Sequence, residues 1–170
     1  MAIIFPNGTV FGFSRMWSKE KGSVLYHVKA SQWNDTSTYV EEFNNTLFPQ
    51  WVYPGVEDQY IYQDGDGYFH FLFHNMIPGI GGGHNEYFSG AHAASMDGYN
   101  WTFFGYSWDN NVTYDDGTYH VFKTTERPHL IFDKDGCSPV ALINAAIPMD
   151  ENKCGKYGDK STTFIVPIYH

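Results

Sequence analysis

Short apolar stretches alternate with turn residues along the whole chain, and a helical repeat of apolar positions is almost absent. The stretches are rich in β-branched and aromatic side chains, and Gly, Asn and Asp separate them, which is typical of strands. The sequence therefore predicts an all-β fold. We expect strands at Thr9–Ser14, Val24–Ala30, Gln59–Tyr62, Tyr68–His74, Ser89–Ser95, Trp101–Tyr106, His129–Phe132, Val140–Asn144 and Thr163–Ile168.

Three segments repeat one pattern, in which an apolar strand, an Asn-Gly or acidic turn and a second apolar strand follow one another. They read IIFPNGTVFGF, YIYQDGDGYFHFLF and LIFDKDGCSPVALI, and their turn glycines are Gly8, Gly67 and Gly136. Turns of this kind suit right-twisted hairpins. The first two hairpins are each followed by a strand that carries Ala-Ser and then by a Trp, in VKASQWN and in HAASMDGYNW.

Each repeat therefore predicts an inner hairpin, a third strand, a Trp-bearing turn and an outer strand. A repeated four-stranded antiparallel unit is a β-propeller blade, whereas a β-sandwich with hairpins that are alike by chance is the alternative. Residues 1–170 provide about two and a half to three blades, and a propeller needs at least four for closure. We expect a single β-propeller fragment that lacks its N-terminal blades, or a chain that closes a ring with other propeller chains or with copies of itself.

Composition narrows the class of partner. Aromatic residues make up 19% of the chain, which suits β-sheet packing and also the stacking of sugars on flat rings. The formal net charge of −9 argues against nucleic acid and against an anionic membrane as partners, since both need a basic surface. No stretch approaches the roughly 18 apolar residues of a membrane span. A neutral polymer such as carbohydrate, or a cation, fits this charge better.

Other features are typical of secreted proteins, although the N-terminus MAIIFPNGTV does not resemble a signal peptide. Sequons for N-glycosylation begin at Asn7, Asn34, Asn44, Asn100 and Asn111. The chain has two cysteines, Cys137 and Cys154, which an oxidising compartment would join in a disulfide that closes a short loop. Two free thiols are the alternative.

Carboxylates recur at the same point of the repeat. Glu57 and Asp58 precede the inner strand of the second repeat, and Glu126 with Arg127 precedes that of the third. The inner strands of a propeller all begin at one mouth of its channel, so these side chains are expected to converge there. Convergent carboxylates are what glycosidic bond cleavage requires. The alternative is that the acids only accept backbone N–H bonds at the start of a strand.

The ordered runs VEDQYIYQDGDGYFHFLFHNM, SGAHAASMDGYNWTFF and TERPHLIFDKDG…PVALINAA resemble the five-bladed β-propeller glycoside hydrolases, most closely the glycoside hydrolase family 43-like sequences. The resemblance covers about residues 3 to 147. It implies a partial five-bladed propeller, a channel filled by calcium or water, and inverting hydrolysis of arabinose-, xylose- or galactose-type polysaccharides.

By blade position, the resemblance makes Glu57 the general acid and Asp58 its pKa modulator, with Glu126, Arg127, His74 and His92 shaping the substrate pocket. Two departures weigh against activity of the chain alone. Gln59 stands where the family often has Pro, and the first-blade base has no counterpart in this sequence. A non-catalytic glycan-binding or structural extracellular subunit is therefore the second hypothesis.

Histidine spacing excludes one metal site. His70 and His74 lie four residues apart, which on a strand separates them by about 13 Å, so they cannot share one ion. We predict no metal ligands among the site residues, and a structural calcium in the channel is the sole cofactor that the resemblance suggests. His92 is either a sugar- or ion-contacting residue or a hydrogen-bonded core histidine.

Overall fold

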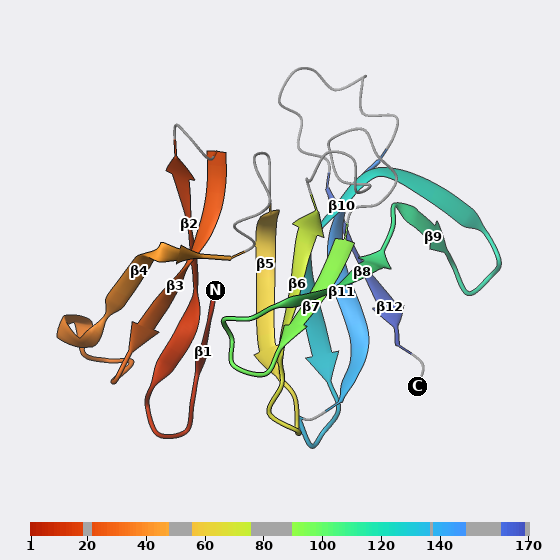
Figure 1. Ribbon diagram of the computed structural model, residues 1–170. Helices are drawn as coiled ribbons and strands as arrows, with labels where there is room; N and C mark the ends of the chain where they lie inside the picture. The colour runs from red at the N-terminus through yellow and green to blue at the C-terminus, as the bar shows by residue number, and fades with distance from the viewer. Residues whose placement is uncertain (19–21, 48–55, 76–89, 137, 149–160, 169–170) are drawn as a thin grey trace.

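The computed structural model describes residues 1–18, 22–47, 56–75, 90–136, 138–148 and 161–168. The described chain is all-β, as the sequence predicts, and forms three four-stranded antiparallel sheets (Figure 1). A single 3₁₀ turn, η1, covers Thr36–Thr38. No helix in these described segments is long and apolar enough to cross a membrane.

The first sheet has the strand order β1-β2-β3-β4, and the second has the order β5-β6-β7-β8. Every strand in them pairs with its neighbour in sequence, so each sheet is a simple meander. The strands of the first sheet are β1 Ala2–Ile4, β2 Val10–Ser18, β3 Gly22–Ala30 and β4 Val40–Thr46. The strands of the second sheet are β5 Val56–Gln63, β6 Phe69–Asn75, β7 Gly90–Ser95 and β8 Thr102–Trp108.

The third sheet has the order β12-β11-β10-β9. Its strands are β9 Asn111–Thr113, β10 Tyr119–Phe132, β11 Pro139–Pro148 and β12 Thr162–Pro167. The long strand β10 pairs with β9 through its first residues and with β11 through the rest. The hairpin of β10 and β11 therefore corresponds to β1–β2 and β5–β6.

The predicted strands are all present, and Ser89 lies outside the described residues. Most boundaries are shifted by a few residues, but the strand predicted at His129–Phe132 begins at Tyr119. The hairpin repeat predicted β1 as the strand before the Gly8 turn and β4 as the outer strand of the first repeat, without giving their ranges. Strand β9 was not predicted, because it is only three residues long. The predicted hairpin repeat is confirmed. The turn glycines Gly8, Gly67 and Gly136 all have left-handed φ, at 87°, 88° and 72°. Each donates its N–H to the carbonyl three residues earlier, at 2.8, 3.1 and 3.0 Å.

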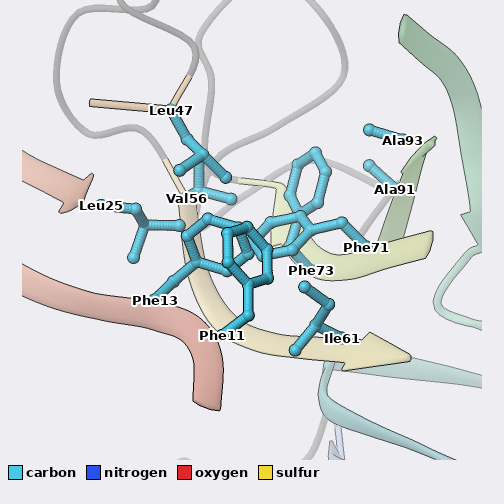
Figure 2. Packing of buried hydrophobic residues seen from close by; sticks show 10 residues of the cluster. All are labelled: Phe11, Phe13, Leu25, Leu47, Val56, Ile61, Phe71, Phe73, Ala91 and Ala93. Atoms are coloured by element: carbon cyan, nitrogen blue, oxygen red, sulfur yellow. The ribbon is translucent and has the colours of Figure 1, made fainter. Parts of the chain in front are cut away.

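Aromatic rings fill the space between the first and second sheets (Figure 2). Phe13 of β2 meets Phe71 of β6 edge to face, with ring centroids 5.3 Å apart, and meets Trp101 at 5.8 Å. Ala91 and Ala93 of β7 are fully buried beside these rings, so small side chains make room for large ones. Phe71 and Phe73 thus form the aromatic face of β6 that alternation with His70 and His74 predicts.

The second and third sheets pack together through the other face of β5 and β6. Strand β10 contacts both of these strands. Tyr60 meets His129 with ring centroids 5.1 Å apart, and Tyr62 meets Phe132 at 5.3 Å. Strand β5 also contacts β1, so β1, β5 and β10, which hold the same place in the three repeats, lie in succession.

Phe71→Ala should lower the free energy of unfolding by about 3–5 kcal/mol, because it empties the centre of the first aromatic interface. Phe104→Ala is the matched control, since Phe104 is 66% exposed. Urea unfolding measures both variants. Equal losses in the two would show that the interface does not determine stability.

Gly90→Ala should cost about 1–3 kcal/mol, because a Cβ at Gly90 would lie 1.8 Å from the ring of Trp108. Gly65→Ala is the control, because a Cβ there meets nothing within 4 Å. Thermal unfolding, followed by tryptophan fluorescence, measures the change. A Gly90→Ala protein with unchanged stability would mean that Trp108 does not pack on β7 in this way.

Candidate functional site

The inner strands β5 and β10 both break their regular pairing at the predicted acidic positions. The register shifts between Glu57 and Tyr60 in β5, and between Glu126 and His129 in β10. Within these bulges Asp58 has φ 52° and Arg127 has φ 54°, which is uncommon for residues other than glycine. A bulge turns a side chain away from its regular direction. The second and third repeats therefore have the same backbone irregularity at the positions that the sequence repeat predicts to be equivalent.

Three predicted site residues come together at these bulges. One donor atom from each of Asp58, His74 and Glu126 lies within 4.8 Å of the other two. His74 is buried on β6, whereas both carboxylates are partly buried. Asp58 belongs to the second sheet and Glu126 to the third, so the packing of one sheet on the other forms the group. We name Asp58, His74 and Glu126 the acid cluster.

The surroundings of Asp58 favour its protonated form. Burial raises the pKa of its carboxyl above the usual value, and the charges of Glu126 and Glu57 raise it further. The charges of Arg127 and His74 oppose this shift. Asp58 is thus a carboxyl that retains its proton to higher pH than an exposed aspartate does. That is the property of a general acid.

Glu126 has a polar neighbour on each side of its carboxylate. Thr124 donates its hydroxyl to Oε1 at 3.1 Å, and the Arg127 guanidinium lies 4.0 Å from Oε2. Glu126 and Arg127 also line a small cavity of about 130 Å³ with Ala145, Ile147 and Ser161. Arg127 is mostly exposed, so its charge acts on both acids from the solvent side.

Glu57 has a different environment from Asp58. It forms an ion pair with Arg15 of β2, which joins the second sheet to the first. Glu57 is paired with His74 across the β5–β6 ladder, so it lies next to the acid cluster. Sequence reasoning did not identify Arg15. The signal that could have identified Arg15 is its position in the second half of β2, in the first repeat, where a basic side chain faces Glu57 of the second repeat.

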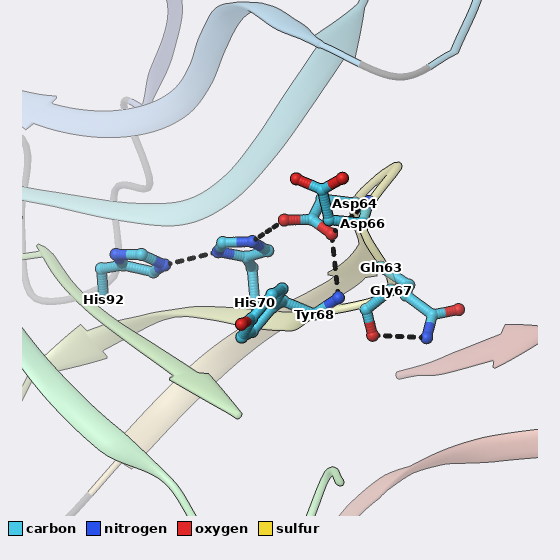
Figure 3. Close-up of polar contacts among 7 residues, drawn as sticks. All are labelled: Gln63, Asp64, Asp66, Gly67, Tyr68, His70 and His92. Carbon is cyan, nitrogen blue, oxygen red and sulfur yellow. Dashed lines mark hydrogen bonds and ion pairs between the residues drawn. The ribbon is translucent and has the colours of Figure 1, made fainter. Parts of the chain in front are cut away.

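His92 lies in a separate polar chain (Figure 3). The two imidazoles are joined by a hydrogen bond of 3.0 Å between Nδ1 of His70 and Nε2 of His92. Nε2 of His70 in turn donates to Oδ2 of Asp64 at 2.9 Å. Burial, and secondarily the charge of His70, lowers the pKa of His92 to about 4, so His92 is neutral at physiological pH. His70 and His74 have different partners, in agreement with the strand spacing.

The donor atoms of the acid cluster do not resemble a calcium cage. Ca²⁺ takes six to eight oxygen ligands. The cluster offers two carboxylates and one imidazole, a set better suited to a transition metal than to calcium. We therefore derive no chemistry through a structural calcium in this cluster.

The predicted modification sites fall into two groups. Asn7, Asn34, Asn44 and Asn100 are exposed, whereas Asn111 is partly buried and bonded to Asp109. Cys137 and Cys154 lie outside the described residues, so their disulfide stays a prediction.

A search of protein-family models gives no match, and a search of curated proteins gives none either. What the chain does must therefore be inferred from the geometry of the acid cluster and from the ordered motifs of the sequence.

Proposed function

We propose that this chain is a secreted β-propeller protein that acts on carbohydrate, with Asp58 and Glu126 as its acid and its carboxylate partner. The observation that carries the proposal is the convergence of Asp58, His74 and Glu126 within 4.8 Å at matching bulges of two inner strands. The three four-stranded sheets are taken as successive blades of a five-bladed propeller. The motif resemblance to five-bladed glycoside hydrolases includes the same residues, although it makes Glu57 the acid and Asp58 its pKa modulator.

The reaction follows from the two carboxyl groups. Protonated Asp58 donates its proton to the glycosidic oxygen. The bond between that oxygen and the anomeric carbon breaks, and the leaving group departs as an alcohol. The Glu126 carboxylate attacks the anomeric carbon, which gives a glycosyl ester. Water then cleaves the ester, with the Asp58 carboxylate accepting the water proton.

The spacing of the acids favours retention of configuration. Inverting enzymes hold their carboxyl groups roughly 6.5–9.5 Å apart to admit a water molecule, whereas retaining enzymes hold them about 5–5.5 Å apart. One carboxylate oxygen of Asp58 lies within 4.8 Å of one of Glu126, which is closer than the separation in inverting enzymes. With this pair the expected mechanism differs from the inverting one that the resemblance implies.

A non-catalytic glycan-binding propeller is the second candidate. The observation that favours it is the ion pair between Glu57 and Arg15, which gives one predicted catalytic acid a role in joining two sheets. In that case the acid cluster would bind sugar hydroxyl groups without cleaving the glycosidic bond.

Hydrolysis of 4-nitrophenyl arabinosides, xylosides and galactosides tests the first candidate. Asp58→Asn and Glu126→Gln should each lower kcat by about 100-fold or more, because each removes an acid–base or nucleophilic group. Glu41→Gln, an exposed position on β4, is the matched control and should leave kcat unchanged. Proton NMR of the first product should show the retained anomer.

Three outcomes would redirect the proposal. An inverted first product would exclude the Asp58–Glu126 pair as acid and nucleophile. Loss of activity in Glu57→Gln alone, with Asp58→Asn active, would make Glu57 the acid. Saturable binding of xylo- or arabino-oligosaccharides without hydrolysis would support the second candidate.

Asp58→Asn should also raise the free energy of unfolding at pH 7. A carboxyl whose pKa is raised in the folded protein contributes stability that is present below the unfolded pKa of about 3.9 and is lost as pH rises through the folded pKa. Asparagine does not ionise, so the variant does not lose this stability as the pH rises. Asparagine also tolerates the left-handed backbone at position 58. The gain should therefore be largest at neutral pH and should vanish below about pH 4.

Urea unfolding at several pH values measures this difference. Asp115→Asn, in the exposed β9–β10 turn, is the control for the change in net charge. An Asp58→Asn protein that is less stable than the original at pH 7 would show that ionised Asp58 stabilises the fold.

A further inference from the structure

The acid cluster brings together side chains of the kinds that bind metal ions. One donor atom from each of Asp58, His74 and Glu126 lies within 4.8 Å of the other two. Among the described residues, no other group of three His, Cys, Asp or Glu side chains converges in this way. Strands β5, β6 and β10 supply one side chain each, so the ligands come from two sheets that pack together. This arrangement has a use beyond the acid–base chemistry proposed for Asp58 and Glu126.

The separation of the donor atoms is compatible with one small ion between them. Zn²⁺ binds oxygen and nitrogen ligands at roughly 2.0–2.2 Å, so the ligand atoms of a tetrahedral site lie about 3.4 Å apart. The limit of 4.8 Å leaves at most about 1.4 Å of approach between any two of the donor atoms. Both carboxylates are only partly buried, so rotation of their side chains can supply a shift of this size.

Neighbouring groups orient the Glu126 carboxylate. Thr124 donates its hydroxyl to Oε1 at 3.1 Å, and Asn144 donates from Nδ2 to the backbone carbonyl of Glu126 at 3.3 Å. The Arg127 guanidinium lies 4.0 Å from Oε2, beyond hydrogen-bond distance, so this oxygen can turn to an ion. Hydrogen bonds to a ligating carboxylate are typical of the groups that surround a bound metal.

An ion can reach the cluster from its Glu126 side. Glu126 lines a cavity of about 130 Å³ with Arg127, Ala145, Ile147 and Ser161. A water molecule takes up about 30 Å³ in the liquid, so the cavity has room for water molecules that complete the coordination of an ion. His74 is buried, but its donor nitrogen lies within the same 4.8 Å of both carboxylates. An ion held between the carboxylates is therefore next to the imidazole.

The donor set selects among metals. Two carboxylates and one imidazole offer too few oxygens for Ca²⁺, whereas imidazole is a good ligand for zinc, iron, nickel and copper. Three protein ligands with water in the fourth position are the arrangement of catalytic zinc sites. The charge of Arg127 opposes binding of a cation. Arg127 is 64% exposed, however, so solvent and salt screen its charge.

We propose that Asp58, His74 and Glu126 bind one divalent transition-metal ion, with Zn²⁺ preferred and water as the remaining ligand. Metal binding stands whether or not the chain cleaves glycosides. One consequence rests on the proposed function. The ion occupies both carboxylates of the reaction, so Zn²⁺ should inhibit hydrolysis in competition with the substrate.

Calorimetric titration of the full, metal-free chain with Zn²⁺, without a histidine tag, measures binding directly. We expect one ion per chain with a Kd on the order of 1–10 μM, weaker than four-ligand structural sites because three protein groups bind. About 10 mM Ca²⁺ should change this Kd by less than about threefold. The measurement does not depend on activity. Zinc binding to a chain that hydrolyses no glycoside would remove the proposed function and leave the metal site.

Variants identify the ligands. Asp58→Asn and Glu126→Gln should each weaken Zn²⁺ binding by about tenfold to 100-fold, because a neutral amide is a poorer ligand than a carboxylate. Glu57→Gln is the matched control. It removes one negative charge next to the cluster, from an acid that pairs with Arg15, and should weaken Zn²⁺ binding by less than about threefold.

Co²⁺ in place of Zn²⁺ locates the ion in the unaltered chain, because a paramagnetic ion shifts and broadens the NMR signals of nearby residues. The signals of His74 and of Ala145, which is opposite Glu126 in the sheet, should be among the most affected. This measurement decides the question even if neither cluster variant folds.

Four outcomes would overturn the proposal. The first is the absence of saturable binding by about 100 μM Zn²⁺. The second is a Glu57→Gln protein that loses as much affinity as Glu126→Gln does. The third is a thiolate charge-transfer band of Co²⁺, which would place the ion on Cys137 or Cys154. The fourth is a Co²⁺ effect that leaves His74 unchanged, which would show adventitious binding at other side chains.

Discussion

Face-to-face packing of the sheets through aromatic rings is the interaction on which the rest of this structure depends. Phe13 against Phe71 joins the first two sheets, and Tyr62 against Phe132 joins the second and third. Large rings bury much apolar surface in a thin layer, and edge-to-face contacts add specificity to the packing. Because the sheets stack in this way, the inner strands β5 and β10 lie beside each other. Asp58 and Glu126 then meet although they are far apart in the sequence.

The bulges in the inner strands allow Glu57 and Asp58 to be placed independently, which sheet packing alone does not. In a regular strand neighbouring residues point to opposite faces, so Glu57 and Asp58 could not be placed independently. The left-handed conformation of Asp58 interrupts this alternation and leaves Glu57 to pair with Arg15. Unusual backbone conformations persist when the surrounding structure fixes them, and they gather at functional sites. Partial burial of Asp58 also persists because the surrounding structure fixes it, although burial disfavours the ionised form of the carboxyl.

Local patterns in the sequence were enough to predict the strands and hairpins, because turn glycines and alternation act over a few residues. The repeat also predicted that Glu126 would approach the acids of the second unit. Other contacts depend on register between distant strands. Neither the ion pair of Arg15 with Glu57 nor the chain from Asp64 through His70 to His92 follows from local spacing alone. Strand β9 was missed because its three residues, Asn111–Thr113, show no periodicity.

Asn144 links the bulge of β10 to the packing between the second and third sheets. Its Nδ2 donates to the carbonyl of Glu126, in the bulge of β10, and Asn144 is one of the residues around a cavity of about 600 Å³ between the second and third sheets. Asp109 contacts the same strand by another route, because its backbone carbonyl accepts the hydroxyl of Thr125, the residue before Glu126, at 3.1 Å. A change at Asn144 therefore acts on the strand that carries a candidate acid as well as on the packing between the two sheets.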